Sequence, residues 1–166
     1  FFAFAKCSSA KNCLNLKNVI ITTSNIELKQ NVFDKCDNLK PIQIPNDFNN
    51  IEQFNGIETK KVEIGSCRNE CIYTIDQDNN LLSFYGNGML ESIGELSEDK
   101  RNQITNITIS SSIILLGDNL FDSFTTLQEI KYEGINEPMC SENGFGNIDS
   151  IEYINVPIDY EIYDDQ

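Results

Sequence analysis

A repeat of 23 or 24 residues is the feature that most constrains how this chain can fold. Cys13 and Cys36 lie 23 residues apart, as do Arg101 and Phe124, and Ile148 follows Phe124 after 24. We call these five residues the anchors of the repeat. Apolar and polar residues also alternate in an ordinary β protein, but that alternation would not place apolar residues at the same distances after each anchor. The third, sixth and eighth residues after each anchor are all apolar: Leu16, Val19, Ile21; Leu39, Ile42, Ile44; Ile104, Ile107, Ile109; Leu127, Ile130, Tyr132; and Ile151, Ile154, Val156.

The repeat predicts a solenoid in which successive coils lie on one another. Each coil is expected to contain one short strand, a turn, and an irregular or short helical return. One coil cannot bury its apolar side alone, so stacking of equivalent residues into an inward ladder stabilises the fold. The ladder is predicted to contain Val19, Ile42, Ile107, Ile130 and Ile154.

The pattern changes after the second coil. Val62 and Ile64 fit an anchor at Gly56, only 20 residues after Cys36, so this coil is expected to be truncated. Further along, two strand-like runs at residues 71–75 and 81–86 flank a turn rich in Asp and Asn. These runs predict a β-hairpin, followed by an acidic connection with some helical potential.

The hairpin turn also resembles the start of a calcium loop. Asp76-x-Asp78-x-Asn80 has the spacing of the first ligands of an EF-hand, but Leu81 and Asn87 stand where that loop needs Gly and Glu. A turn therefore explains the triplet better than a calcium site.

Composition excludes several classes of function. The net charge of −14 argues against nucleic-acid binding and against adsorption to anionic membranes, and the absence of histidine removes His-dependent triads and HExxH zinc sites. No run is long enough for a membrane span, and no tandem CxxC pairs suggest zinc. We therefore expect a non-enzymatic protein without a metal or other cofactor.

The repeat residues resemble the BspA-like (Treponema pallidum-type) leucine-rich repeats, whose unit reads C-x-x-L-x-x-I-x-I-P-x-x-V-x-x-I-G-x-x-A-F-x-x-C. Residues 13–36 and 101–124 carry the closest matches, although Cys is absent at Arg101, Phe124 and Ile148. The Gly86-x-Gly88-Met89 ending of the hairpin and the motif at 136–140 also resemble the family. The resemblance implies a mainly β, α/β-type solenoid: a right-handed leucine-rich-repeat solenoid with short strands, irregular or short helical convex turns and an inserted β-hairpin cap.

This architecture divides the chain into four parts. Residues 1–5 are interpreted as either a signal-peptide remnant ending at Ala3-x-Ala5 or the tail of a repeat. Residues 6–66 form the first repeat block, 67–100 the hairpin cap and connection, and 101–166 the second block.

The cysteines favour an oxidising compartment. Their even number suits disulfides, although six cysteines allow 15 pairings. The triplet Asn106-Ile107-Thr108 would be a glycosylation acceptor in a secreted chain. We therefore expect a secreted or extracellular cell-surface protein. The disulfide candidates are Cys7, Cys13, Cys36, Cys67, Cys71 and Cys140.

The family resemblance places the residues between the inward ones on a concave sheet and implies adhesion to protein ligands. A protein ligand or surface-complex partner is the leading expectation. One alternative is a lectin-like carbohydrate-binding subunit that uses Tyr153, Asn155 and acidic neighbours, with or without calcium. The other is a structural subunit whose open repeat ends stack on a partner or on copies of itself. A glycan on Asn106 would obstruct the same face. The candidate ligand-binding residues are Asn18, Ile20, Gln43, Thr108, Lys131, Tyr153 and Asn155.

Overall fold

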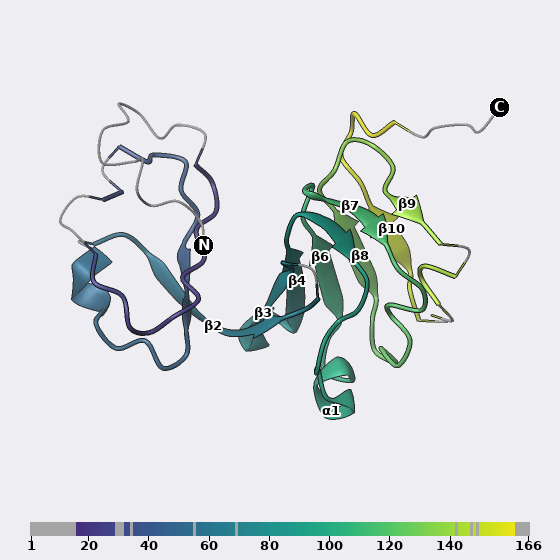
Figure 1. Cartoon of the computed structure of the whole chain (residues 1–166), viewed down its shortest axis with the longest axis horizontal. Helices are drawn as coiled ribbons and strands as arrows, with labels where there is room; N and C mark the ends of the chain where they lie inside the picture. The colour runs from purple at the N-terminus through teal and green to yellow at the C-terminus, as the bar shows by residue number, and fades with distance from the viewer. Residues whose placement is uncertain are drawn as a thin grey trace. The chain divides into compact units, whose positions relative to one another are not determined.

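The computed structural model describes residues 16–28, 32–33, 35–54, 56–68, 70–141, 143–146, 148 and 150–161 (Figure 1). The expected signal remnant or repeat tail at 1–5 lies outside these residues, as do Cys7 and Cys13. Strands predominate, and helix in the described part of the chain is limited to α1 (Glu98–Arg101) and two short 3-10 turns, η2 (Ile51–Phe54) and η3 (Gln77–Asn79). The predicted mainly β fold with short helical turns is confirmed.

The chain forms two compact units, residues 1–63 and 64–166, and each has its own apolar core. Within the described residues, no helix is both long and apolar enough to span a membrane.

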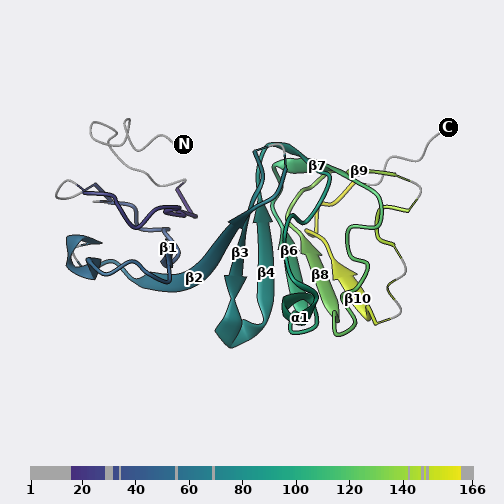
Figure 2. The ribbon, with the colours of Figure 1, turned by 60° about the horizontal axis from the view of Figure 1, so that its bottom comes forward.

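The main sheet of the second unit begins with the hairpin, whose strands are β3 (Ile72–Asp76) and β4 (Leu81–Tyr85). They pair antiparallel, which confirms the predicted hairpin. Three parallel strands follow, β6 (Asn106–Ile109), β8 (Glu129–Tyr132) and β10 (Tyr153–Asn155), in the order β3-β4-β6-β8-β10. Figure 2 shows these strands side by side.

The register of these strands confirms the part of the predicted inward ladder formed by Ile107, Ile130 and Ile154, while β2 (Thr59–Ser66), β3 and β4 separate Ile42 on β1 (Ile42–Pro45) from Ile107 on β6. Ile107 lies opposite Ile130, and Ile130 lies opposite Ile154, so equivalent residues of successive coils are neighbours. Leu82 of the hairpin joins the same ladder opposite Ile107, which the repeat analysis did not foresee. Leu82, Ile107 and Ile130 are at most 1% exposed, whereas Ile154 on the last strand is 47% exposed.

A second, three-stranded sheet corrects the expected shape of each coil. It consists of the parallel strands β5 (Gly88–Leu90), β7 (Ile113–Leu116) and β9 (Met139–Cys140), where an irregular return was expected. The continuous apolar run of β7 lacks the alternation that identifies a half-buried strand in a sequence. Its pairing with β5 and β9 arises only when the coils stack.

The core of the second unit contains aromatic as well as aliphatic side chains. Phe84, Phe121 and Phe124 are almost fully buried, and the Phe121 and Phe124 rings pack edge to face with centroids 6.3 Å apart. Arg101 occupies an anchor at which the family motif has Cys; its guanidinium lies 5.8 Å from the centre of the Phe124 ring, and its Nε donates to the Leu96 carbonyl. The guanidinium at one anchor therefore lies over the aromatic ring at the next.

The first unit contains β1 (Ile42–Pro45), which pairs in parallel with the first half of β2 (Thr59–Ser66). An isolated bridge joins Ile20 to Gln43, and Gln43 N–H donates to the Val19 carbonyl, so two predicted coils are adjacent as expected. Its core includes Val19, Ile21, Ile42, Ile44, Phe33, Phe48 and Phe54.

The truncated coil is out of phase with this core. The Gly56 frame predicts Val62 opposite Ile42, but Val62 pairs with Pro45 and Ile42 pairs with Thr59. Val62 is nevertheless buried. The connection between β1 and β2 is three residues shorter than the repeat frame requires. The pairing of β2 with β1 is therefore shifted by three residues from the predicted register.

Candidate functional site

The candidate site is the outward side of the main sheet of the second unit, opposite the buried ladder. Side chains alternate between the two sides of a strand, so the residues between the ladder members share this side. Thr108 lies opposite Lys131, and Lys131 lies opposite Asn155. These three predicted ligand-binding residues therefore form one cross-strand row, about 4.8 Å apart in the direction of pairing.

A second row lies beside the first. Asn106 is opposite Glu129, and Glu129 is opposite Tyr153, the fourth predicted residue of this unit. We call the two rows together the outward face. Its members are Ser83, Thr108, Lys131 and Asn155 in one row and Leu81, Asn106, Glu129 and Tyr153 in the other.

Hydrogen bonds and a salt bridge restrain several polar groups of the face. Asn155 Nδ2 donates to Glu129 Oε1, and Asn106 Nδ2 donates to Thr105 Oγ1 over 2.9 Å. Lys131 Nζ lies 3.9 Å from Glu133 Oε1, a solvated ion pair that contributes little to stability. The Tyr153 side chain is half exposed and offers an aromatic surface beside these polar groups.

The remaining predicted ligand-binding residues form a separate set in the first unit. Ile20 and Gln43 lie opposite each other across the isolated bridge, and both are partly buried. Asn18 is exposed, two residues before Ile20.

Sequence reasoning missed the contribution of the hairpin to the outward face. Leu81 continues the row of Asn106, and Ser83 continues the row of Thr108. A signal was present, because Leu81, Ser83 and Tyr85 alternate with Leu82 and Phe84 along the strand. The parallel pairing of β4 with β6 is visible only in the structure, and it adds the partly exposed Leu81 to the face, whereas Ser83 is only 5% exposed.

The predicted glycosylation acceptor lies in the middle of this face. Asn106 is partly buried on the central strand β6, between Leu81 and Glu129 on the neighbouring strands. A glycan there would cover both rows, as expected from the sequence. Modification of Asn106 stays a prediction.

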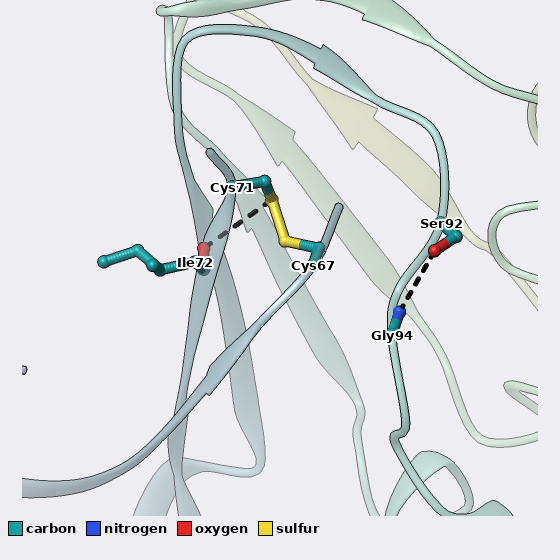
Figure 3. The surroundings of a disulfide bond; sticks show 5 residues. All are labelled: Cys67, Cys71, Ile72, Ser92 and Gly94. Atoms are coloured by element: carbon teal, nitrogen blue, oxygen red, sulfur yellow. Dashed lines mark hydrogen bonds between the residues drawn. A yellow bond between two sulfur atoms is a disulfide. The ribbon is translucent and has the colours of Figure 1, made fainter. Parts of the chain in front are cut away.

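Two of the six disulfide candidates are bonded to each other. Figure 3 shows the disulfide between Cys67 and Cys71, immediately before β3. The Cys67 N–H also donates to the Cys71 carbonyl. Gly94 approaches this loop in a left-handed conformation (φ +74°), and a Cβ there would lie 2.5 Å from the Ser66 carbonyl oxygen. The loop therefore requires glycine at this position.

The other cysteines are not in disulfides that the structure describes. Cys36 is buried in the core of the first unit, and Cys140 is an exposed free thiol. Pairings of Cys7, Cys13 and Cys36 stay predictions.

The Asp76–Asn80 segment is a turn, as the sequence indicated. Residues Gln77–Asn79 form η3, Asn80 adopts a left-handed conformation (φ 49°), and Asn79 Nδ2 donates to Asp76 Oδ2. Across the residues that the structure describes, no group of three His, Cys, Asp or Glu side chains could hold a metal ion.

Three titratable groups near the end of the second unit have perturbed pKa values. Burial is the main cause that raises the pKa of Tyr132, Cys140 and Tyr160, and Glu137 adds to it for Cys140 and Tyr160. The Tyr132 hydroxyl donates to the Ile113 carbonyl. These shifts oppose ionisation of the thiol and of both phenols.

Comparison with known proteins identifies the repeat family of the stacked coils described above. The family model of the BspA-type leucine-rich repeat region matches residues 2–97 and 78–166, with six copies of the repeat. No curated protein and no solved structure matches the chain. The family match agrees with the ladder of successive coils in the main sheet. The chain belongs to the BspA-type leucine-rich repeat proteins.

Proposed function

We propose that this chain is a non-enzymatic, secreted or cell-surface module that binds a protein ligand through the outward face of its second unit. The observation that carries the proposal is the register of β6, β8 and β10, which aligns Thr108, Lys131 and Asn155 in one row. Aligned polar side chains on a parallel sheet present a broad surface with little rearrangement on binding.

The chemistry of the face supports a protein ligand. Interface residues that contribute most to affinity are often aromatic or Arg side chains surrounded by polar groups. Tyr153 is half exposed beside Glu129 and Asn155, and it is the aromatic anchor in this proposal. Membership of a repeat family that generally forms surface-associated protein-binding modules supports the adhesive role.

An extracellular location is part of the same proposal. The Cys67–Cys71 disulfide supports it, because such bonds persist in oxidising compartments and are rare in the cytosol.

Binding to immobilised extracellular-matrix proteins tests the proposal. The purified chain is compared with Tyr153→Ala and Lys131→Glu, and Arg68→Glu is the control because it makes the same charge change in the exposed Cys67–Cys71 loop. We expect a matrix protein to bind, each face variant to weaken binding about tenfold or more, and the control to leave it unchanged. Equal binding by the face variants and the control would place the interface elsewhere.

A glycan array, with and without a calcium chelator, distinguishes the proposed protein-binding function from the main alternative, a lectin-like function. Sugar binding that chelation abolishes would replace the protein-ligand proposal with the lectin-like function.

A further inference from the structure

The last coil of the second unit exposes apolar side chains that earlier coils bury. Ile154 occupies the same ladder position as Leu82, Ile107 and Ile130, but it is 47% exposed while they are at most 1% exposed. Six of the eight large exposed apolar residues in the described part of the chain lie at position 135 or beyond. These six, which we call the terminal patch, are Ile135, Met139, Tyr153, Ile154, Val156 and Ile158.

The backbone at this end has an unused pairing edge as well. β10 is the last strand of its sheet in the described structure. The Glu129 and Glu133 N–H groups donate to carbonyls of the neighbouring coil at Thr105 and Ile109, so the peptide groups of Ile130 face β10. Because Ile130 lies opposite Ile154, its peptide groups pair with those of Tyr153 and Asn155, and alternation directs the peptide groups of Ile154 to the opposite edge, where an added strand would find a donor and an acceptor.

The segment after β10 covers only part of this end. The Tyr160 ring packs on Tyr132, and the Glu161 N–H donates to the Ile135 carbonyl, which places the segment beside the start of β9. Ile154 and Val156 remain about half exposed in its presence.

Charge identifies the kind of partner that fits. Residues 132–166 contain nine Asp and Glu and no Lys or Arg. Glu152 flanks β10 directly, and Glu137 precedes β9 by two residues. A second copy of the same end would bring like charges together, whereas a cationic strand would pair with them.

We propose that the β10 edge and the terminal patch bind an extended, cationic protein segment in which basic and apolar residues alternate. The segment adds to the main sheet as its next strand, its apolar side chains cover Ile154 and Val156, and its basic side chains face the surrounding carboxylates. This surface meets the outward face at Tyr153, but strand addition uses the peptide groups and the ladder side of β10, so the inference does not rest on the function proposed above.

A short peptide in which Lys and Val alternate tests the proposal, with a Glu and Val peptide of the same length as the charge control. We expect the chain to bind the Lys peptide, binding to weaken as salt rises, and the Glu peptide not to bind. Hydrogen exchange should slow at the Ile154 amide when the Lys peptide binds. Equal binding of both peptides, or protection only at other amides, would overturn the proposal.

Two variants of one residue test the backbone donor of this edge. Ile154→Pro and Ile154→Ala both remove the isoleucine side chain, but only Ile154→Pro also removes the outward-directed donor, and both leave the residues that pair with β8. We expect Ile154→Pro to weaken binding of the Lys peptide about three- to tenfold more than Ile154→Ala does. Equal affinities of the two variants would contradict strand addition.

Light scattering and hydrogen exchange of the chain alone test whether a second copy of the chain occupies this edge instead of a cationic partner. A concentration-dependent dimer with the Ile154 amide protected would show that a second copy covers this edge, and the cationic-partner proposal would be wrong.

Discussion

Packing against neighbouring side chains limits the residue type at individual positions as strongly as the repeat does. Gly65 lies beneath the ring of Tyr73, and a Cβ there would come within 2.1 Å of the tyrosine Cζ. Tyr73 cannot easily move away, because it is buried and packs edge to face on Phe84. The backbone at Gly65 has no positive φ, so the requirement for glycine is steric.

Gly65→Ala is therefore expected to destabilise the chain by about 1–3 kcal/mol. Without the ring the same change would be neutral or slightly stabilising, because alanine reduces the entropy of the unfolded chain. Urea unfolding of Gly65→Ala, Tyr73→Leu and the double variant measures the coupling between the two positions. A loss that is equally large in the Tyr73→Leu background would locate the strain in the backbone.

At the level of secondary-structure elements, the strands of the main sheet have equivalent sequences but unequal surroundings. β6 has strands on both sides, whereas β10 pairs only with β8 in the described structure. Burial of an isoleucine therefore depends on the position of its coil in the stack. The hydrophobic contribution of each rung should follow the area that its neighbours cover.

Ile107→Ala and Ile154→Ala test this dependence on position with the same chemical change. We expect Ile107→Ala to lower the free energy of unfolding by about 2–5 kcal/mol, because it leaves a cavity between two rungs. Ile154→Ala should cost about 1 kcal/mol or less, because about half of its surface is already in water. Chemical denaturation of both variants gives the comparison, and similar losses would mean that the last coil is as well covered as the central ones.

On the scale of the whole molecule, charge is divided very unequally between the two units. The first unit carries eight Lys and seven Asp and Glu, a net charge of +1, and the second carries four Lys and Arg and nineteen Asp and Glu, a net charge of −15. The acidic character of the chain is therefore a property of the second unit. Mutual repulsion among these carboxylates opposes its compact state.

Screening should stabilise the second unit. A fragment of residues 64–166, which contains its own core, is expected to unfold at a higher temperature in sodium chloride at physiological strength than in low-salt buffer. Circular dichroism melts measure the shift, and sucrose at matched osmolality is the uncharged control. A melting temperature that does not change with salt would mean that favourable local pairs offset the repulsion.

The sequence alone determined the coils, the ladder of Ile107, Ile130 and Ile154, and the hairpin before them. Apolar residues that return in the same phase can all be buried together only if the coils stack, so these features follow from pattern. The tertiary structure decided the second sheet around β7, the slipped register of Val62 and the exposure of Ile154. These features depend on which segment lies beside each strand, and identical local patterns acquire different burial when their neighbours differ.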